Sequence, residues 1–421
     1  MSHRPFPQRP IRYFNDWFDA GSQEYQAGMN EWHIAEGYRF AGVVIGLRSE
    51  PDRRDLAVIV SDRPAAAAGV FTQNRVCAAP VQLSRERLPR SDARAVVICS
   101  GNANACTGEQ GLTNARRMAE LVAAGVGCSA EQVLVASTGV IGRPLPMAIL
   151  EAGIPKATAV LQPGADAFND AAHAILTTDT RIKVSSRAAV DSYSITGFAK
   201  GAAMIGPNMA TMLGFLFADA AVDAEDLQSI LRRCTADTFN CISVEGHTST
   251  NDTVLILANG AGPKLAGATL DRFEHSVHDV CEELARAIAE DAEGAQHLIT
   301  IDVEGCRTDA EARTIAKAIA ESALVKTAVF GADPNWGRVV SAAGYCGVDF
   351  DERQLSLQMG SFLLYERGVP LPFDAKLASA YLRDNRNVDF RVTLELGSGR
   401  CRFYTCDLTT EYVNLNADYT T

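Results

Sequence analysis

The chain has 421 residues, 47% of them hydrophobic and 21% charged, and a formal net charge of −12 at pH 7. These values are typical of a soluble globular protein that is long enough to bury a large core. The acidic balance argues against general nucleic-acid binding, which needs a basic face. The sequence has no apolar run of membrane-spanning length and no signal peptide, so we expect a cytoplasmic protein.

Eleven cysteines are present, an odd number, and none belongs to a Cys-x-x-Cys pair. This usage favours reduced, mostly buried thiols over a disulfide framework or a zinc ribbon. His275 and His278 have helical spacing and could ligate a metal, but no cysteine or carboxylate pattern accompanies them. A solvated helix face is the favoured interpretation, and we expect no metal.

Residues 1–34 differ in composition from the rest of the chain. They are rich in proline, arginine, glutamine and aromatic residues. The aromatic residues argue against simple disorder. We therefore expect an N-terminal arm that packs on the body of the protein or on a partner subunit.

In the first half of the chain, short strands alternate with helices. Apolar runs predict buried strands at 55–62, 93–99 and 132–137, and a helix over 113–124. The third strand is expected to end in a polar turn, Thr138-Gly139.

The second half predicts helices over 223–239, 271–292 and 309–323, and strands at 252–258, 389–395 and 401–407. The last 30 residues are expected to alternate as strands. The strongest helix signal is the apolar face of 271–292, where residues recur at spacings of three and four: Phe273, Val277, Val280, Leu284, Ala287 and Ile288. The fold class is α+β, with mixed sheets covered by helices and two lobes that meet near the midpoint.

The most informative segment is KGAAMIGPNMATMLGF (200–215), at the middle of the chain. It places one hydroxyl, Thr211, in an apolar run after a Gly-Pro-Asn turn. By itself, a threonine in such a run is usually a β-branched core residue. A cut before Thr211 would leave pieces of 210 and 211 residues.

That segment resembles the self-cleavage site of the ornithine acetyltransferase (glutamate N-acetyltransferase) family. Further strings match the family in order from residue 36 onward. They are EGYRFAGVVIG (36–46), SDRPA (61–65), GVFTQNR (69–75), SGNANACTG (100–108), ASTGVIG (136–142), TTDT (177–180), TSTND (248–252), EGA (293–295), LVKTA (324–328), DPNWGR (333–338), CDLT (406–409) and YVNLNADYTT (412–421). Each string is weak alone, but the ordered set covers roughly nine-tenths of the chain and is specific.

The resemblance implies autocatalytic cleavage of the Ala210–Thr211 bond. It divides the chain into an arm (1–34), an α fragment (35–210) and a β fragment (211–421) that begins with the nucleophile. Gly206, Pro207 and Asn208 could hold a strained turn that favours the cut, although an ordinary tight turn explains them equally well. The resemblance also implies an N-terminal-nucleophile-like architecture, related to the aminopeptidases of that class.

Acyl transfer through a covalent intermediate needs a nucleophile, a base and an oxyanion cradle. An N-terminal threonine supplies the first two, because its hydroxyl attacks while its own α-amine takes the proton. Before cleavage that amine is tied up as an amide. The chemistry therefore explains why such an enzyme must be cut.

The resemblance assigns further residues by their matching positions. Thr138 and Gly139 form the oxyanion hole, and Lys200 and Glu293 line the substrate site. Lys200 could pair with a substrate carboxylate and Glu293 with a substrate ammonium. The remaining matching substrate positions are Asn416, the terminal Thr421, and Thr177 or Thr178.

The chain departs from the family pattern around these positions. The usual Lys-Gly-Ser-Gly-Met has Ala202 and Ala203 at its centre here. The usual DGDTSTND is EGHTSTND (245–252), with His247, and the usual DGEGATK is DAEGAQH (291–297), with Ala292, Gln296 and His297. The substrate preference is therefore less firmly implied than the type of reaction.

The function implied is acetyl transfer from N2-acetylornithine to glutamate through acetyl-Thr211, without a metal or an organic cofactor, in an assembly of two α and two β fragments. Acetyl-CoA is a co-substrate for some family members, and no feature of this sequence decides its use here. Three alternatives stay open: an N-terminal-nucleophile amidase or aminopeptidase, a transferase for another amine in a specialised pathway, and a degenerate homologue that only binds.

Overall fold

The computed structural model describes residues 32–188, 192–206 and 212–417. The body of the chain begins at Trp32. Several expectations lie outside the described residues: most of the arm 1–34, the Ala210–Thr211 bond, Pro207 and Asn208 of the preceding turn, and the terminal Thr421.

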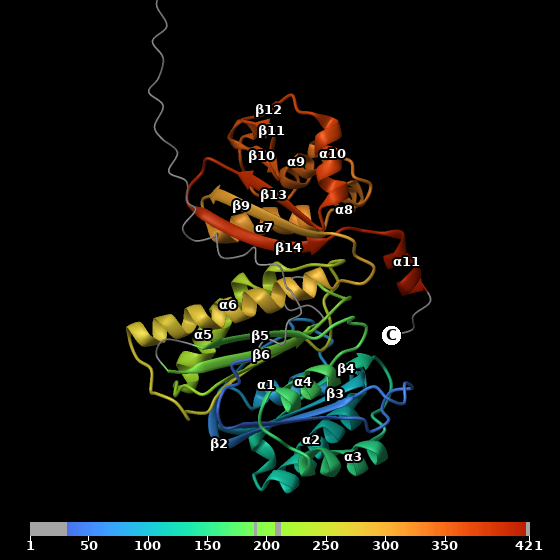
Figure 1. The fold of residues 1–421 in the computed structure, drawn as a ribbon, viewed down its shortest axis with the longest axis vertical. Coiled ribbons are helices and arrows are strands. Elements are labelled where there is room, and N and C mark those ends of the chain that lie inside the picture. The colour runs from blue at the N-terminus through green and yellow to red at the C-terminus, as the bar shows by residue number, and fades with distance from the viewer. Residues whose placement is uncertain (1–31, 189–191, 207–211, 418–421) are drawn as a thin grey trace, which may run out of the picture. The chain divides into compact units, whose positions relative to one another are not determined.

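The first sheet has eight strands in the order β4-β3-β2-β8-β7-β6-β5, with β1 paired to β2 (Figure 1). Their bounds are β1 Tyr38–Val43, β2 Leu56–Phe71, β3 Arg90–Asn102, β4 Val133–Val140, β5 Lys183–Ala188, β6 Ser194–Lys200, β7 Leu213–Ala218 and β8 Thr253–Ala258. The long strand β2 pairs with β1 and β3 through its first half and with β8 through its second half. The sheet therefore forms two layers, and β2 belongs to both.

The inner faces of the two layers share one apolar core. Phe40, Ile59 and Ile98 from the layer of β1–β4 meet Phe215 and Phe217 from the layer of β5–β8. Because each layer is also covered by helices on its outer face, strands such as β7 are buried along their whole length. This explains their continuous apolar runs.

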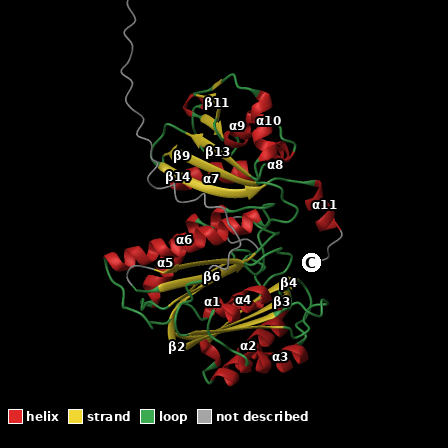
Figure 2. Ribbon diagram, viewed as in Figure 1, coloured by secondary structure: helices red, strands yellow, loops and turns green. Residues whose placement is uncertain are grey.

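Helices cover both outer faces of this sandwich (Figure 2). α2 (Gly108–Val126) and α3 (Met147–Ala159) pack on the layer of β1–β4, and α5 (Ala224–Asp237) and α6 (Ala268–Glu290) pack on the layer of β5–β8. α6 buries the apolar face that the sequence spacing predicts. Two shorter helices, α1 (Ala79–Glu86) and α4 (Ala165–Ala174), complete this part, and the short 3-10 helices η1 (Ala130–Gln132) and η2 (Phe239–Cys241) lie in its connections.

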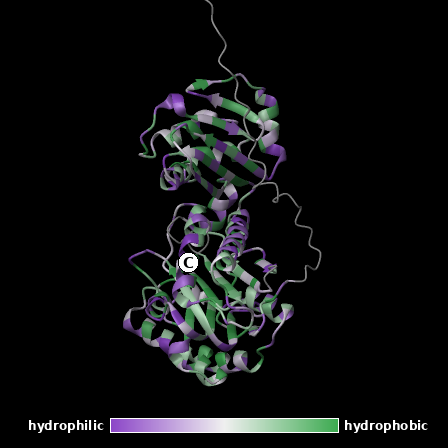
Figure 3. Cartoon of the chain, turned by 90° about the vertical axis from the view of Figure 1, so that its left-hand side faces the viewer, coloured by the Kyte–Doolittle hydropathy of each residue, from purple (hydrophilic) through white to green (hydrophobic). Residues whose placement is uncertain are grey.

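The second sheet has six strands in the order β12-β11-β10-β13-β9-β14. Their bounds are β9 Leu298–Cys306, β10 Ser356–Met359, β11 Phe362–Glu366, β12 Val369–Pro370, β13 Asn387–Thr393 and β14 Gly399–Cys406. Its helices and 3-10 turn are α7 Asp309–Ala320, α8 Ala323–Phe330, α9 Trp336–Gly344, η3 Glu352–Gln354 and α10 Ala375–Asp384. Polar and apolar residues alternate along its strands, as the purple and green bands of Figure 3 show, because one face packs on the core; in β13 alternate residues are buried.

The α+β class with mixed sheets and helices is confirmed, but the boundary between the sheets lies near residue 297 and not near the midpoint. The midpoint falls between β6 and β7, which are antiparallel neighbours in one sheet. A boundary there would break that ladder. The expectation of lobes that meet near the midpoint was therefore wrong.

Most expected elements are present, with two differences. The helix expected over 309–323 ends at Ala320 because Ser322 caps a new helix, α8, by accepting a hydrogen bond from the Val325 amide. The last 30 residues form β13 and β14 as expected, but then the helix α11 (Thr410–Ala417). All eleven cysteines are free thiols, as expected. Across the described ranges, no helix is long and apolar enough to cross a membrane.

Candidate active site

The candidate site forms where strands from both layers end together. Thr138 lies near the end of β4 in one layer, and Lys200 is the last residue of β6 in the other. Lys200 Nζ donates a hydrogen bond of 3.3 Å to Thr138 Oγ1. Two residues that are 62 positions apart in sequence, both assigned to the site by the resemblance, are thus brought into contact.

Gly139 lies within a strand and not in the expected turn. β4 continues through it, with Gly139 opposite Gly101 of β3. Its φ of +128° is unfavourable for other residues, and a Cβ there would lie 2.3 Å from the Gly101 carbonyl carbon. Only glycine fits this position, because the backbone of the neighbouring strand occupies the space of a side chain. The expected turn was wrong because β3 pairs past the end of the apolar run.

Lys200 is a buried cation that forms no ion pair with the described residues. Burial lowers the pKa of Lys200, while the charge of Asp179 opposes this effect. An ammonium group has three donors and no acceptor, so Thr138 Oγ1 must be the acceptor in their contact. The Thr138 hydroxyl hydrogen remains free to donate to another group.

A buried network of charged side chains lies next to Lys200 and binds the amide of the residue that follows it. Lys183 Nζ lies 2.7 Å from Asp179 Oδ1 and 2.6 Å from Asp291 Oδ2. Asp179 Oδ1 also accepts a hydrogen bond of 2.6 Å from the Gly201 amide. Although burial by itself would raise the pKa of Asp179, the charges of Lys183 and Lys200 lower it below its usual range. These residues were missed, although Asp179 lies within the TTDT string and Asp291 begins the string that contains Glu293.

Residues of the TTDT string (177–180) form hydrogen bonds with one another and with Asp291. The Thr177 amide donates a hydrogen bond of 3.0 Å to Asp179 Oδ2, and the Thr180 amide donates one of 3.1 Å to Asp291 Oδ2. Thr177 and Thr178 are both half-buried. Which of the two contacts substrate stays a prediction.

Glu293 and Asn416 are brought together at the other end of the site. Asn416 Nδ2 donates a hydrogen bond of 3.0 Å to Glu293 Oε2, and the Glu293 amide donates one of 2.9 Å to the Ala202 carbonyl. A Cβ on Gly294 would lie 2.5 Å from the Tyr412 nitrogen, so α11 lies directly against this turn. The structure therefore places two matched positions of the sequence, 293 and 416, and the departure at 202 around one turn.

Two further carboxyl groups adjoin the segments on either side of residue 211, and sequence reasoning missed both. Glu245 Oε1 accepts a hydrogen bond of 2.5 Å from the Ile205 amide, and Asp252 Oδ1 accepts one of 3.2 Å from the Met212 amide. In the described part of the chain, the second oxygen of each is buried and has no hydrogen-bond partner. Burial raises the pKa of both groups, that of Glu245 to about 7. Both lie in the string EGHTSTND, which could have pointed to them.

Thr211 itself lies outside the described residues, but its neighbours fix where the chain continues. Leu213 opens β7 opposite Lys200, and Met212 is held by Asp252. The chain therefore re-enters the described structure beside Lys200.

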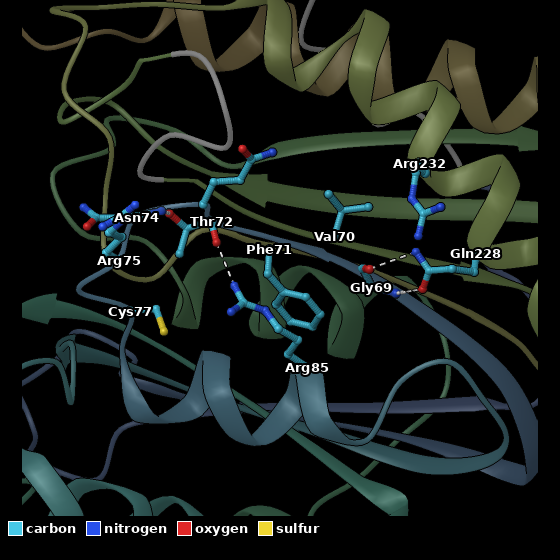
Figure 4. Close-up of a pocket in the computed structure, with 11 residues that line it drawn as sticks. Gly69, Val70, Phe71, Thr72, Asn74, Arg75, Cys77, Arg85, Gln228 and Arg232 are labelled. Carbon is cyan, nitrogen blue, oxygen red and sulfur yellow. Dashed lines mark hydrogen bonds between the residues drawn. The ribbon is translucent and has the colours of Figure 1, made fainter.

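A separate cavity of about 470 Å³ lies near the end of β2 (Figure 4). Arg85 donates a hydrogen bond of 2.7 Å to the Thr72 carbonyl, and the Gln228 side chain binds both backbone groups of Gly69. The residues around the cavity do not include Thr138, Lys200 or Glu293. The cavity is therefore distinct from the candidate site.

The sequence matches the model of the ArgJ family over residues 39–421. It is 45% identical to the arginine biosynthesis bifunctional protein ArgJ of Thermosynechococcus vestitus, over 92% of this chain and 97% of that protein. The protein of the same name from Geobacter sulfurreducens is also 45% identical, over 92% of this chain and 99% of that one. A solved ornithine acetyltransferase from Mycobacterium tuberculosis, complexed with ornithine, is 41% identical over 41% of this chain and 92% of that chain, with a TM-score of 0.40.

Proposed function

Because the chain belongs to the ArgJ family, we propose that it is a cytoplasmic glutamate N-acetyltransferase of arginine biosynthesis that moves acetyl from N2-acetylornithine to glutamate. The observation that carries this proposal is the contact between Lys200 and Thr138 beside the start of β7. It places a free hydroxyl donor and a buried cation next to the strand that follows Thr211. A carboxylate-bearing amide can be held there while its carbonyl is attacked.

The first step is self-cleavage. The Thr211 hydroxyl attacks the Ala210 carbonyl, the peptide C–N bond breaks, and water opens the resulting ester. The products are a carboxylate on Ala210 and a free α-amine on Thr211, whose ordinary pKa near 8 suits a general base.

In the transfer, Thr211 Oγ attacks the acetyl carbonyl of N-acetylornithine, and the α-amine of Thr211 takes the hydroxyl proton. The Thr138 hydroxyl and the Gly139 amide donate to the oxyanion. The C–N bond then breaks, ornithine leaves with the proton, and acetyl-Thr211 remains. The glutamate amine attacks this ester, N-acetylglutamate leaves, and the Thr211 hydroxyl is restored.

Lys200 and Glu293 have complementary roles in binding. The buried Lys200 ammonium pairs with the α-carboxylate that every substrate of this cycle carries. Glu293 binds the ammonium end of ornithine, with Asn416 to orient its carboxylate. Thr177 or Thr178 and the terminal Thr421 complete the substrate site. The cycle needs no metal or organic cofactor, and acetyl-CoA could serve only as an additional acetyl donor.

We propose that two α and two β fragments assemble into a heterotetramer. Native mass spectrometry of the purified protein measures this directly. A mass of two cleaved chains is expected, and the mass of a single cleaved chain would contradict it.

Cleavage tests the nucleophile. Intact mass and denaturing gel analysis should show two near-equal fragments in the wild type, the second beginning at Thr211. Thr211→Ala should give one full-length band. A wild type that stays whole would remove the basis for an N-terminal nucleophile.

The division of the acetyl group between transfer to glutamate and release as acetate tests the type of reaction. With N-acetylornithine labelled in its acetyl group, label should appear in N-acetylglutamate faster than in free acetate. Release of acetate without transfer would instead favour a hydrolase that uses the same Thr211.

A further inference from the structure

Two glutamates, Glu245 and Glu293, lie at the end of the site remote from Thr138. Both hold the segment that follows Lys200: Glu293 through the Ala202 carbonyl, and Glu245 through the Ile205 amide. Glu293 Oε2 is bound by Asn416, whereas Glu245 Oε2 is buried and has no partner among residues 32–188, 192–206 and 212–417. An unpaired buried oxygen is costly unless a ligand or a proton occupies it.

The groups around Glu245 shift its pKa in opposite directions. Burial raises the pKa of Glu245 to about 7, and the charge of Glu293 adds to this rise, whereas the Ile205 amide, Lys326 and the Met204 amide oppose it. Lys326 is itself occupied by Thr405 Oγ1, at 3.0 Å, and by the Cys406 carbonyl. Burial, together with the charges of Glu245 and Glu293, raises the pKa of Tyr412 in α11 to about 12, so it remains a neutral phenol.

Other titratable groups near Glu245 are already paired. Glu321 lies beside Gly246 and forms an ion pair of 2.6 Å with Lys317. Burial raises the pKa of the Cys406 thiol, which stays neutral beside Lys326. The neighbours of Glu245 therefore tune its charge without forming an ion pair with it.

In the proposed cycle, one site must bind two side chains of opposite charge. Ornithine and glutamate occupy the same site in turn, and both present an α-carboxylate to Lys200. Their side chains, however, end in opposite charges, an ammonium and a carboxylate. A site with fixed negative charge would bind ornithine and repel glutamate.

We propose, resting on the proposed function, that Glu245 determines specificity for both substrates by changing its charge: it is a carboxylate opposite the ornithine ammonium, and a carboxylic acid that donates a hydrogen bond to the glutamate carboxylate. The proton comes from solvent when glutamate binds and returns to solvent when ornithine binds. No bond other than O–H forms or breaks at Glu245. Glu293 keeps its hydrogen bond from the amide of Asn416.

Competition between acceptors tests this proposal. Glutamate and ornithine labelled in its carbon chain are offered together to the enzyme with unlabelled N-acetylornithine as donor, and the initial rates of formation of N-acetylglutamate and of labelled N-acetylornithine are measured from pH 6 to 8.5. Both acceptors need a free α-amine and the same Thr211. The pH dependence of these shared groups therefore largely cancels in the ratio of the two products. We expect the ratio of glutamate to ornithine acetylation to fall by about tenfold per pH unit, as one binds the acid and the other the base of a single group.

Glu245→Gln fixes the group in a neutral form. Acetylation of ornithine should lose about tenfold to a hundredfold in kcat/KM, since a charged partner is removed, while that of glutamate is largely kept. The product ratio should then no longer depend on pH. The matched control is Glu282→Gln, another buried glutamate, which binds Tyr404 and not the segment 200–205. It should keep the wild-type ratio at every pH.

Proton uptake supplies a test that needs no variant. Calorimetry of the wild type in buffers of different ionisation enthalpy should show protons taken up with glutamate and released with ornithine near pH 7. Equal proton exchange for both ligands, or a flat product ratio in an enzyme that transfers acetyl to both, would overturn the role of Glu245. Absence of acetyl transfer to either acceptor would instead overturn the proposed function.

Discussion

The two ends of the candidate site are built in different ways. The strand end, formed by Thr138, Gly139 and Lys200, is fixed by ladders of hydrogen bonds in β3–β4 and β6–β7. The tail end, formed by Glu245, Glu293 and Asn416, is held by turns and by the single helix α11. In the proposed cycle, the strand end binds groups that both substrates share, and the tail end binds the part that differs. The rigid strands thus hold the residues proposed to act in the reaction itself, and the turns and α11 hold those proposed to distinguish the substrates.

The largest effect is expected at Gly139. Gly139→Ala would force β4 away from Gly101, because the added Cβ would lie 2.3 Å from its carbonyl carbon. We expect loss of acetyl transfer by at least about a hundredfold, as for removal of an oxyanion donor. The matched control is Gly142→Ala, where φ is +79° but no atom lies within 4 Å of the new Cβ. Equal loss in both variants, measured by kcat, would show that backbone strain and not the close contact matters.

Lys200→Met tests the other member of the strand end. Removal of the buried cation should weaken kcat/KM for both acceptors by about 2–5 kcal/mol, because each loses the partner of its α-carboxylate. The ratio between glutamate and ornithine should stay unchanged. Lys264→Met, at an exposed lysine, serves as control. A variant that altered the ratio instead would place Lys200 at the variable part of the substrate.

His297 tests how the junction of β9, β14 and α10 is held together. The His297 ring lies 2.7 Å from Asp407 Oδ2 and 2.9 Å from the Leu382 carbonyl. Asp407 lies between β14 and α11. The hydrogen bond to Asp407 raises the pKa of His297, so its charged form stabilises the folded state below the unfolded pKa near 6.5. This contribution is lost as pH rises through the folded pKa.

His297→Gln should therefore lower the free energy of unfolding by about 1–2 kcal/mol at pH 5.5, and by less at pH 8.5. Denaturant titrations of both proteins at the two pH values measure the difference. A gap that widens with pH would contradict the charged pair. The departure from the family at this position thus serves the junction of β9, β14 and α10, not the carboxylates of the site.

The smallest effect is expected for Asn416→Ala. Asn416 is exposed and contributes one hydrogen bond to Glu293, so KM should rise by about two- to tenfold with little change in kcat. Steady-state kinetics with N-acetylornithine measure this. A fall in kcat as large as that of Gly139→Ala would show that the tail end also positions the reacting atoms.

The sequence predicts some parts of this structure well for physical reasons. The apolar spacing of 271–292 leads directly to α6, because an amphipathic face has one way to be buried. The strands at 93–99 and 252–258 are recognisable because they are apolar on both faces. The contact between Thr138 and Lys200 is seen only in the structure, since no local pattern joins strands of different layers; the resemblance named both residues but not their contact.

Other features leave no local signal. Asp179, Lys183 and Asp291 look like surface charges in sequence, and only the fold shows that both carboxylates pair with the one ammonium in the interior. Glu245 and Asp252 were missed for the same reason. The strand at Gly139 was mistaken for a turn, because the close approach of β3 depends on residues nearly 40 positions away. α11 was missed because it is short and buries no residue.

The placement of the proposed cut has a consequence for how the protein is made. β6 and β7 lie on opposite sides of residue 210 yet share a ladder, and β8 inserts between β7 and β2. Each half made alone would therefore present bare strand edges, which invite aggregation. The chain has to fold in one piece and be nicked afterwards, and the two products should stay interlocked until the whole sandwich unfolds.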